Sequence, residues 1–329
     1  MIVNRYCTAM VTIIPSVSAL PEASRVLREG RLVAVPTETV YGLAADASNA
    51  DAVAKIYTAK GRPNFNPLIV HVADIEMAQR CGAFDDLSLR LAETFWPGPL
   101  TLIVPLRPEA GIASAVTAGL DTIALRQPVG VLADLARELG NGIAAPSANS
   151  SGRISATSAQ HVRDDLGDKV DLMIDGGDCA VGVESTIVKV VDGAISVLRA
   201  GGVSHEQLSA FAPVADATSN ATIESPGQLL AHYAPRVPLR MNAKELADTE
   251  AQLAFGASPL QGGGMTLNLS ATGDLDEAAH NLFAMMKALD DTGTDSIAVQ
   301  PIPERGIGVA INDRLRRAAH GSRREGDDG

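Results

Sequence analysis

The sequence predicts an α/β protein with two domains, a larger domain of strands and helices followed by a smaller βαβ domain. Three observations lead to this prediction. Short β-branched runs alternate with helix-period segments through the first two thirds of the chain. At 329 residues, the chain is longer than one hydrophobic core usually organises. The pattern fails between residues 212 and 235, where small and polar residues mix with prolines, so we expect a linker there.

The elements of the first domain follow from local signals along the chain. Residues 7–14 form an apolar run split by threonines, which favours an opening strand over a signal peptide. Helix-spaced apolar residues then end at Gly30, and a strand is expected at 32–35. Asn49 is a typical N-cap for the next helix, which we expect to end at Gly61. The other expected elements are strands at 67–72, 100–105, 122–126, 142–145, 171–174, 186–191 and 195–198, and helices near 85–95, 130–139 and 156–166.

The second domain follows the predicted linker. Strands at 237–241 and 296–299, with helices near 275–290 and 309–319, predict a small βαβ unit. The predicted boundaries are 1–211 for the first domain, 212–235 for the linker and 236–329 for the second domain.

The charge balance argues against several classes of function. The chain carries 27 Lys and Arg against 39 Asp and Glu, a formal net charge of −12, so it lacks the basic excess of a sequence-independent nucleic-acid binder. Basic residues cluster near the C-terminus, but acidic residues follow at once, and we expect a solvated helix face with a frayed tail. That cluster consists of Arg314, Arg316, Arg317, Arg323 and Arg324.

Neither a membrane span nor a disulfide framework is predicted. No apolar run approaches the roughly 18 residues that cross a bilayer, so no membrane association is expected. The cysteines Cys7, Cys81 and Cys179 are widely spaced and fit neither a disulfide framework nor a CxxC pair. We therefore expect a cytoplasmic protein whose cysteines fill the core.

The motifs of several common enzyme classes are absent from the sequence. It contains no GxxxxGK[ST] loop, no HExxH, no GxSxG elbow and no GxGxxG at a strand-to-helix turn. Polar residues instead gather in five clusters near the ends of predicted elements, where α/β folds place their sites. These clusters lie at 36–43, 60–67, 145–152, 182–188 and 198–202.

Three of these clusters have the chemistry of a ligand site. Together, the clusters at 36–43 and 60–67 predict an anion site, with two hydroxyls, a carboxylate and a phenol in the first and two cations in the second. Lys60 supplies a point charge and Arg62 a bidentate fork suited to phosphate or carboxylate, while nearby prolines stiffen the backbone. Ser147 and Asn149 can hydrogen-bond a ligand that their small neighbours allow to approach the backbone. Plain turns with solvated side chains would have the same sequences. By pattern alone, His71 would be a core histidine of an apolar strand.

Five motifs occur in a fixed order along the first domain. They are 37–43 (TETVYGL), 60–71 (KGRPNFNPLIVH), 96–101 (WPGPLT), 146–149 (PSAN) and 184–187 (ESTI). Together they resemble the YrdC/Sua5 family of threonylcarbamoyl-AMP synthases. Residues 225–235 (SPGQLLAHYAP) and 306–314 (GIGVAINDR) resemble its long, Sua5-type branch, so the resemblance covers nearly the whole chain. It implies a YrdC-like twisted mixed sheet with helices and a smaller, Rossmann-like βαβ C-terminal domain.

The resemblance also implies an activity and a set of site residues. L-threonine, bicarbonate and ATP, with Mg²⁺, would become threonylcarbamoyl-AMP and pyrophosphate for the N6-threonylcarbamoyladenosine (t6A37) modification of tRNA. The product would pass to a tRNA threonylcarbamoyl-transfer complex, and stable tRNA binding is not expected. The residues implied to hold threonine are Thr39, His71, Arg126, Ser147 and Ser185. Those implied to hold ATP are Arg62, Asn66, Thr122, Asn149, Thr157, Arg199 and Tyr233, and the implied catalytic cations are Lys60 and Arg62.

Some features of the chain depart from the family pattern or stay open. The family usually has Met-Pro and then His-Pro after Arg126, where this chain has QPVG at 127–130. It usually has proline where this chain has Ala200. The resemblance gives no role to Glu38 or Glu184. Thr157 is the loosest of the motif matches. An RNA-binding module and a carbamoyl-adenylate transferase of the hydrogenase-maturation type remain alternatives, although the sequence shows neither a basic domain nor paired CxxC motifs.

We also expect the linker to cover the mouth of the site as a lid. A structureless connection of more than about 15 residues is usually either functional or disordered. In the lid arrangement, Tyr233 would contact the nucleotide and shield the product from water. A passive, proline-rich tether would have a similar sequence.

Overall fold

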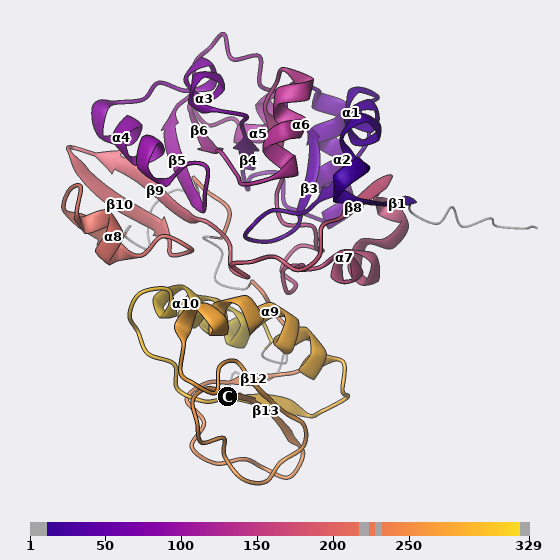
Figure 1. The fold of residues 1–329 in the computed structure, drawn as a ribbon, viewed down its shortest axis with the longest axis vertical. Coiled ribbons are helices and arrows are strands. Elements are labelled where there is room, and N and C mark those ends of the chain that lie inside the picture. The colour runs from indigo at the N-terminus through magenta and orange to yellow at the C-terminus, as the bar shows by residue number, and fades with distance from the viewer. Residues whose placement is uncertain (1–11, 217–223, 228–231, 323–329) are drawn as a thin grey trace, which may run out of the picture.

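The computed structural model describes residues 12–216, 224–227 and 232–322. These residues form a large domain on an 11-stranded sheet and a smaller domain on a four-stranded sheet (Figure 1). The predicted α/β class is confirmed.

The sheet of the large domain is mixed. Its strand order is β1-β8-β2-β3-β7-β4-β6-β5-β9-β10-β11. The central neighbours β4 and β6 are parallel, whereas β4 with β7, β5 with β6 and β9 with β10 are antiparallel. The strands are β1 (Thr12–Pro15), β2 (Val33–Val35), β3 (Gly42–Asp46), β4 (Ile69–His71), β5 (Leu100–Pro105), β6 (Thr122–Arg126), β7 (Ile143–Ala144), β8 (Leu172–Asp175), β9 (Thr186–Val191), β10 (Ala194–Arg199) and β11 (Val214–Asp216).

The helices of this domain begin and end at residues suited to those positions. Asn49 caps the second helix through its side-chain oxygen, which accepts a hydrogen bond from Ala52 N, and Gly61 ends that helix in the left-handed conformation. Ser158 caps a later helix in the same way. The helices are α1 (Leu20–Arg28), α2 (Ala50–Lys60), α3 (Ile75–Cys81), α4 (Asp86–Phe95), α5 (Ser114–Thr117), α6 (Val131–Leu139), α7 (Ala159–Leu166) and α8 (His205–Ser209), with 3₁₀ turns η1 (Ser16–Ser18) and η2 (Gly167–Lys169).

A large core between the sheet and its helices includes Trp96. The indole N–H donates to Leu100 O at 2.7 Å, and the ring packs edge-to-face against Phe84. Because a buried indole N–H needs an acceptor, this bond fixes the turn that leads into β5. The described cysteines Cys81 and Cys179 are free and buried, as predicted for core-filling residues.

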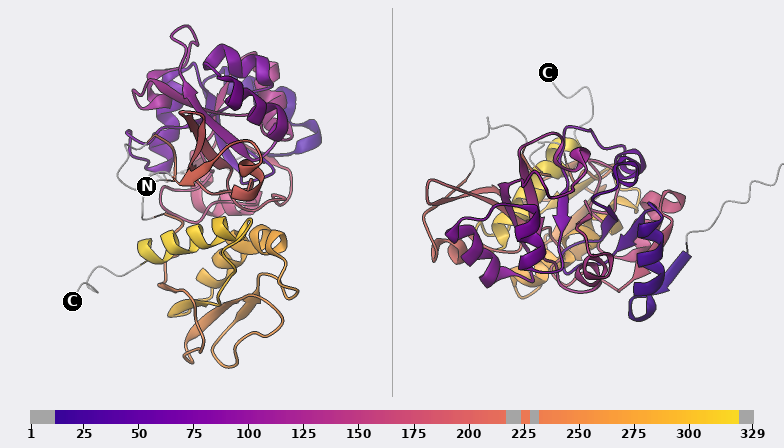
Figure 2. Two further views of the ribbon diagram at one scale, coloured as in Figure 1. Left: turned by 90° about the vertical axis from the view of Figure 1, so that its left-hand side faces the viewer. Right: turned by 90° about the horizontal axis from the view of Figure 1, so that it is seen from above.

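The smaller domain contains a parallel sheet in the order β12-β15-β13-β14. Its elements are β12 (Leu239–Arg240), β13 (Glu250–Ala254), β14 (Thr266–Asn268), α9 (Leu275–Asp290), β15 (Ser296–Val299) and α10 (Gly308–Gly321). In Figures 1 and 2, α9 and α10 lie between this sheet and the large domain. None of the helices among the described residues is both long and apolar enough to cross a membrane.

Several elements differ from the sequence-based expectation. The helix expected at 156–166 begins later, at Ala159, because Ser158 is its N-cap. Strands β3, β11, β13 and β14 were not predicted, and neither were the short helices α3, α5 and α8. The unpredicted β11 lies inside the expected linker, where it pairs with β10 and extends the large sheet. Of the predicted opening strand, residues 7–11 lie outside the described residues.

Arg314 corrects the prediction for the C-terminal basic cluster. The predicted solvated face holds for Arg316, whose side chain is exposed and pairs with Glu304. Arg314, two residues earlier on α10, is instead completely buried against the large domain and pairs with Glu184. The remaining members Arg323 and Arg324 lie outside the described residues.

Candidate active site

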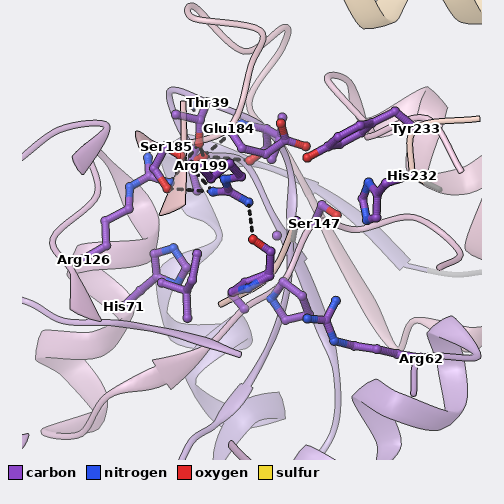
Figure 3. A pocket seen from close by; sticks show the side chains of 18 residues that line it. Thr39, Arg62, His71, Arg126, Ser147, Glu184, Ser185, Arg199, His232 and Tyr233 are labelled. Atoms are coloured by element: carbon purple, nitrogen blue, oxygen red, sulfur yellow. Dashed lines mark hydrogen bonds between the residues drawn. The ribbon is translucent and has the colours of Figure 1, made fainter. Parts of the chain in front are cut away.

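A pocket opens where several loops of the large domain meet the end of the linker. Polar side chains from sequence-distant segments converge on it (Figure 3). His71 and Arg126 come from the ends of the parallel strands β4 and β6, which meet at one edge of the sheet. Ser185 precedes β9, and Arg199 ends the antiparallel neighbour β10. The lining residues with polar or charged side chains are Thr37, Thr39, Arg62, His71, Arg126, Ser147, Glu184, Ser185, Arg199, His232 and Tyr233.

One wall of the pocket is built around Arg126. Its Nη1 donates to Thr39 Oγ1 at 2.9 Å, and its Nε donates to Gly98 O at 3.1 Å. Its Nη2 lies 2.7 Å from a carboxylate oxygen of Glu38. The other oxygen of Glu38 accepts a hydrogen bond from Val129 N, within the 127–130 segment that departs from the family pattern. Glu38, which sequence analysis left without a role, therefore orients Arg126 and anchors that segment.

The opposite wall joins Ser185 to Arg199. Arg199 Nη2 donates to the hydroxyl and to the carbonyl oxygen of Ser185, at 3.0 and 2.9 Å. The Ser185 hydroxyl also lies 2.7 Å from Thr101 Oγ1. Gly201 makes this approach possible, because an added Cβ there would lie 2.3 Å from Glu184 O. Burial lowers the pKa of Arg199.

His71 is a buried imidazole that lines the pocket. Burial, and next the nearby Arg126, lower its pKa to about 3, so it is neutral at physiological pH. Among the described residues, His71 Nδ1 has no hydrogen-bond partner. A buried polar atom without a partner is costly, and a ligand in the pocket would supply one.

The two cations of the predicted anion site occupy different positions. Arg62 lines the pocket, where it is held by hydrogen bonds from Nε to Asn66 O and from Nη2 to Pro67 O. Lys60 is not among the lining residues, and its ammonium donates to the carbonyl oxygens of Ser147 and Asn149. Burial and the nearby Arg62 lower the Lys60 pKa to about 7. Two donors of the Lys60 ammonium thus hold the 146–149 turn. Its predicted role as a catalytic cation stays a prediction.

Four other predicted nucleotide residues are not among those that line the pocket: Asn66, Thr122, Asn149 and Thr157. Thr122 begins β6, at the opposite end of that strand from Arg126, and pairs with Pro105. Thr157 Oγ1 lies 3.3 Å from His161 Nδ1. Asn66 and Asn149 are buried beside the pocket walls, and within the described part of the chain the Oδ1 atom of each lacks a partner. Their predicted roles stay predictions.

Residues of the linker close one side of the pocket. Pro226, Gly227, His232 and Tyr233 all line it. Ala234 N donates to Gly152 O at 2.8 Å, which anchors this part of the linker to the large domain. Burial raises the Tyr233 pKa to about 12 and lowers that of His232 to about 3, so both side chains are neutral. His232 received no role from the sequence, although it lies within the motif at 225–235. Residues 217–223 and 228–231 of the expected lid lie outside the described residues.

The charges around the pocket favour anionic ligands. Three arginines line it, against one carboxylate, Glu184. Burial by itself would raise the Glu184 pKa, but Arg314, Arg199 and a hydrogen bond from Ser155 lower it to about 2. Within the described ranges, no group of three or more His, Cys, Asp or Glu side chains is placed to hold a metal ion.

Comparisons with known proteins match both domains of the chain. The family model described as "Telomere recombination" (Sua5, YciO, YrdC) matches residues 25–201, and the model "Threonylcarbamoyl-AMP synthase, C-terminal domain" matches residues 203–320. A threonylcarbamoyl-AMP synthase of Bacillus subtilis is 39% identical over 92% of this chain and 93% of its own length. One of Pyrococcus abyssi is 38% identical over 90% and 93%. A crystal structure of P. abyssi Sua5 complexed with L-threonine superposes with a TM-score of 0.83 at 33% identity, over 95% of this chain and 98% of the other.

Proposed function

The chain belongs to the Sua5 family of threonylcarbamoyl-AMP synthases, and we propose that its pocket makes threonylcarbamoyl-AMP from L-threonine, bicarbonate and ATP. The observation that carries this proposal is the pocket itself. It combines small hydroxyl side chains with three arginines, and the linker covers one side of it. Such a site suits a small amino acid next to a polyanion.

Threonine would occupy the part of the pocket between Arg126 and Ser185. The guanidinium of Arg126 suits the substrate carboxylate, while Thr39, Ser147 and Ser185 offer partners for its hydroxyl. His71 lines the same pocket and, as a neutral imidazole, would exchange a hydrogen bond with a polar group of the substrate. The P. abyssi structure with bound L-threonine supports threonine as the substrate.

The phosphates of ATP would lie toward Arg62 and Arg199. In the reaction, the threonine amine forms a bond to the carbon of bicarbonate, a carbon–oxygen bond of bicarbonate breaks, and that oxygen leaves as water with a proton from the amine. An oxygen of the resulting carbamate then forms a bond to the α-phosphorus. The bond from that phosphorus to the β-phosphate oxygen breaks, and pyrophosphate leaves. Arg62 and Arg199 would neutralise the charge that develops on the leaving group. No covalent nucleophile is needed, because positioning and charge suffice.

Mg²⁺ would enter on the phosphates of ATP rather than in a cage of protein ligands. This ion commonly binds through substrate phosphates and water, with few carboxylates. The carboxylate at the pocket, Glu184, already faces Arg314, which leaves it poorly suited to a metal. When bound, Mg²⁺ would supply positive charge at the leaving pyrophosphate.

We place the enzyme among the nucleotidyltransferases, since the proposed reaction transfers AMP to a carbamate. The cytoplasm remains the location expected from the cysteine spacing. Of the two alternatives, an RNA-binding module is disfavoured by the net charge of −12. The hydrogenase-maturation alternative does not explain the match of residues 203–320 to the synthase C-terminal domain.

The direct test is pyrophosphate release by the purified protein. We expect release that requires ATP, L-threonine and bicarbonate together, with threonylcarbamoyl-AMP identified by mass spectrometry. Each substrate is omitted in turn as a control. Release that continues without threonine would refute the proposed function, as would the absence of any release with all three substrates present.

A further inference from the structure

Arg314 lies behind the pocket, at the contact between the two domains. It comes from α10 of the smaller domain, yet its side chain is completely buried. Its Nε donates to Glu184 Oε2 at 2.9 Å, and its Nη1 donates to Ala200 O at 2.7 Å and to Asp313 Oδ2 at 2.9 Å. Its guanidinium carbon lies 5.3 Å from the centre of the Tyr233 ring. One side chain thus touches three separate segments that reach the site.

Each of those segments carries a predicted substrate residue. Glu184 directly precedes Ser185, and Ala200 directly follows Arg199. Tyr233 is itself a lining residue, and Phe283 of α9 stacks on it with ring centres 5.4 Å apart. Two side chains of the smaller domain therefore hold Tyr233 in place.

We propose that Arg314 is a positioning residue for the synthase, through which the smaller domain sets the geometry of the substrate pocket. It holds Ser185 through Glu184, Arg199 through the carbonyl oxygen of Ala200, and Tyr233 by direct contact with its ring. The inference rests on the proposed function, since it concerns the same pocket. The smaller domain would thus contribute to the reaction without binding any ligand itself.

The shape of arginine suits this position. The planar guanidinium presents several donors in fixed directions and stacks on an aromatic ring at the same time. A lysine ammonium would keep the charge, but it is a compact point charge without the planar fork. Lysine at 314 should therefore preserve part of the pairing with Glu184 and lose the combined hold on Ala200 and Tyr233.

A purely structural role makes a different prediction. If Arg314 served only to neutralise Glu184, removing both charges would relieve the defect, because the loss of one partner leaves an uncompensated buried charge. Glu184 also accepts a hydrogen bond from Ser155 at 2.6 Å, which glutamine at 184 can keep. The pair Arg314→Met and Glu184→Gln therefore separates neutralisation from positioning.

The experiment compares R314M, R314K, E184Q and the E184Q/R314M double variant of the full chain. R316M is the matched control, since Arg316 is exposed on the same helix and pairs only with Glu304 among the described residues. For each variant, the thermal midpoint, kcat and the KM values for threonine and ATP are measured by pyrophosphate release. We expect R314M to lose at least thirtyfold in kcat/KM with both KM values raised, R314K to lose about tenfold, and R316M to stay within twofold of wild type.

The double variant decides between the two roles. We expect E184Q/R314M to regain thermal stability relative to R314M while staying at least tenfold less active than E184Q. Recovery of activity along with stability would overturn the inference, as would a folded R314M or R314K with wild-type kcat and KM. If R314M does not fold, R314K and the double variant still decide. A wild-type protein that fails to release pyrophosphate would instead refute the proposed function.

Discussion

The charged residues around the pocket are few and strongly constrained. Arg62, Arg126 and Arg199 all line it, within a chain whose formal charge is −12. In each of the three, part of the guanidinium donates hydrogen bonds to backbone carbonyl oxygens of neighbouring loops. Holding a cation in place before the substrate arrives lowers the cost of organising it around developing charge. The same hydrogen bonds make these arginines contributors to stability.

Substitution of Arg62 tests this double role. We expect R62A to lower turnover by around a hundredfold, about 3 kcal/mol of transition-state stabilisation. It should also lower the free energy of unfolding by roughly 1–3 kcal/mol, because Pro67 O loses its donor and Asn66 O keeps only the Tyr57 hydroxyl among the described residues. Pyrophosphate release and urea unfolding measure the two effects. R90A, at an exposed position of α4, should change neither, and near-wild-type turnover in R62A would remove Arg62 from the reaction.

His71 predicts how stability depends on pH. Its folded-state pKa is about 3 and its ordinary value is 6.5, so between these pH values the unfolded chain binds a proton that the folded chain does not. Stability therefore falls as pH falls through this window, by up to about 1.4 kcal/mol per pH unit from this residue. His232 adds a contribution of the same sign. Glu184 contributes a further loss of stability only below about pH 4.5, where the carboxylate becomes protonated in the unfolded chain first.

We therefore expect H71N to show a shallower loss of stability than wild type between pH 6.5 and 4.5. Urea unfolding followed by circular dichroism at several pH values measures the slope. H320N, which removes an exposed histidine, is the control and should keep the wild-type slope. Equal slopes in H71N and wild type would show that His71 is not buried as a neutral ring.

At the scale of elements, sequence patterns predicted helices and strands that have clear local signals and missed elements of both kinds that lack them. Asn49 and Gly61 mark both ends of α2, so its limits were predictable from local chemistry alone. The strand β3 has the sequence GLAAD, and its small residues give neither a β-branched run nor alternation. β11 is only three residues long and is held by pairing with β10. Such elements depend on partners far away in the sequence, which a local pattern does not contain.

The loop before β9 gives a prediction for the contact between the domains. Gly182 has a φ of +78°, and an added Cβ would lie 2.4 Å from Ala279 O and 2.5 Å from His280 Cα on α9. We expect G182A to push α9 away and to lower both the thermal midpoint and the rate of pyrophosphate release, the rate by at least fivefold, because the same loop carries Glu184 and Ser185.

Gly193 offers a closely matched control for this substitution. Its φ is +76°, but no atom lies within 4 Å of an added Cβ. G193A should therefore show only the cost of the left-handed backbone, roughly 1 kcal/mol. The midpoint of G182A should lie several degrees lower still. Identical midpoints and rates for the two variants would contradict a tight contact at Gly182.

At the scale of the whole molecule, the site is assembled from segments spread over most of the chain. Periodicity and capping placed strands and helices but did not bring Thr39, Arg126 and Ser185 together. The resemblance to a family did so, because its motifs name residues without regard to local structure. Arg314 ends the family-like motif at 306–314 but received no role, and local pattern placed it on a solvated helix face, as is usual for a basic cluster. Its burial depends on the docking of one domain on the other.

The linker gives a prediction at this same scale. Its described residues Pro226 and Tyr233 already line the pocket, so a bound nucleotide would contact them. We expect ATP and threonine together to protect the chain from proteolysis between residues 220 and 236. Mass spectrometry of the fragments identifies the cleavage sites, and cleavage elsewhere in the chain is the internal control. A passive tether would be cut equally with and without the substrates.

Trp96 is the single tryptophan of the chain, and it lies in the core of the large domain. Its emission therefore reports on that domain alone, whereas circular dichroism averages over both domains. If the buried contacts between the domains make them one cooperative unit, denaturation curves from the two signals will coincide. If the two domains unfold separately, the curve from Trp96 fluorescence will differ from the curve from circular dichroism. A residue that fixes a turn beside β5 thus also serves as a built-in spectroscopic reporter of how strongly the two halves of the enzyme are linked.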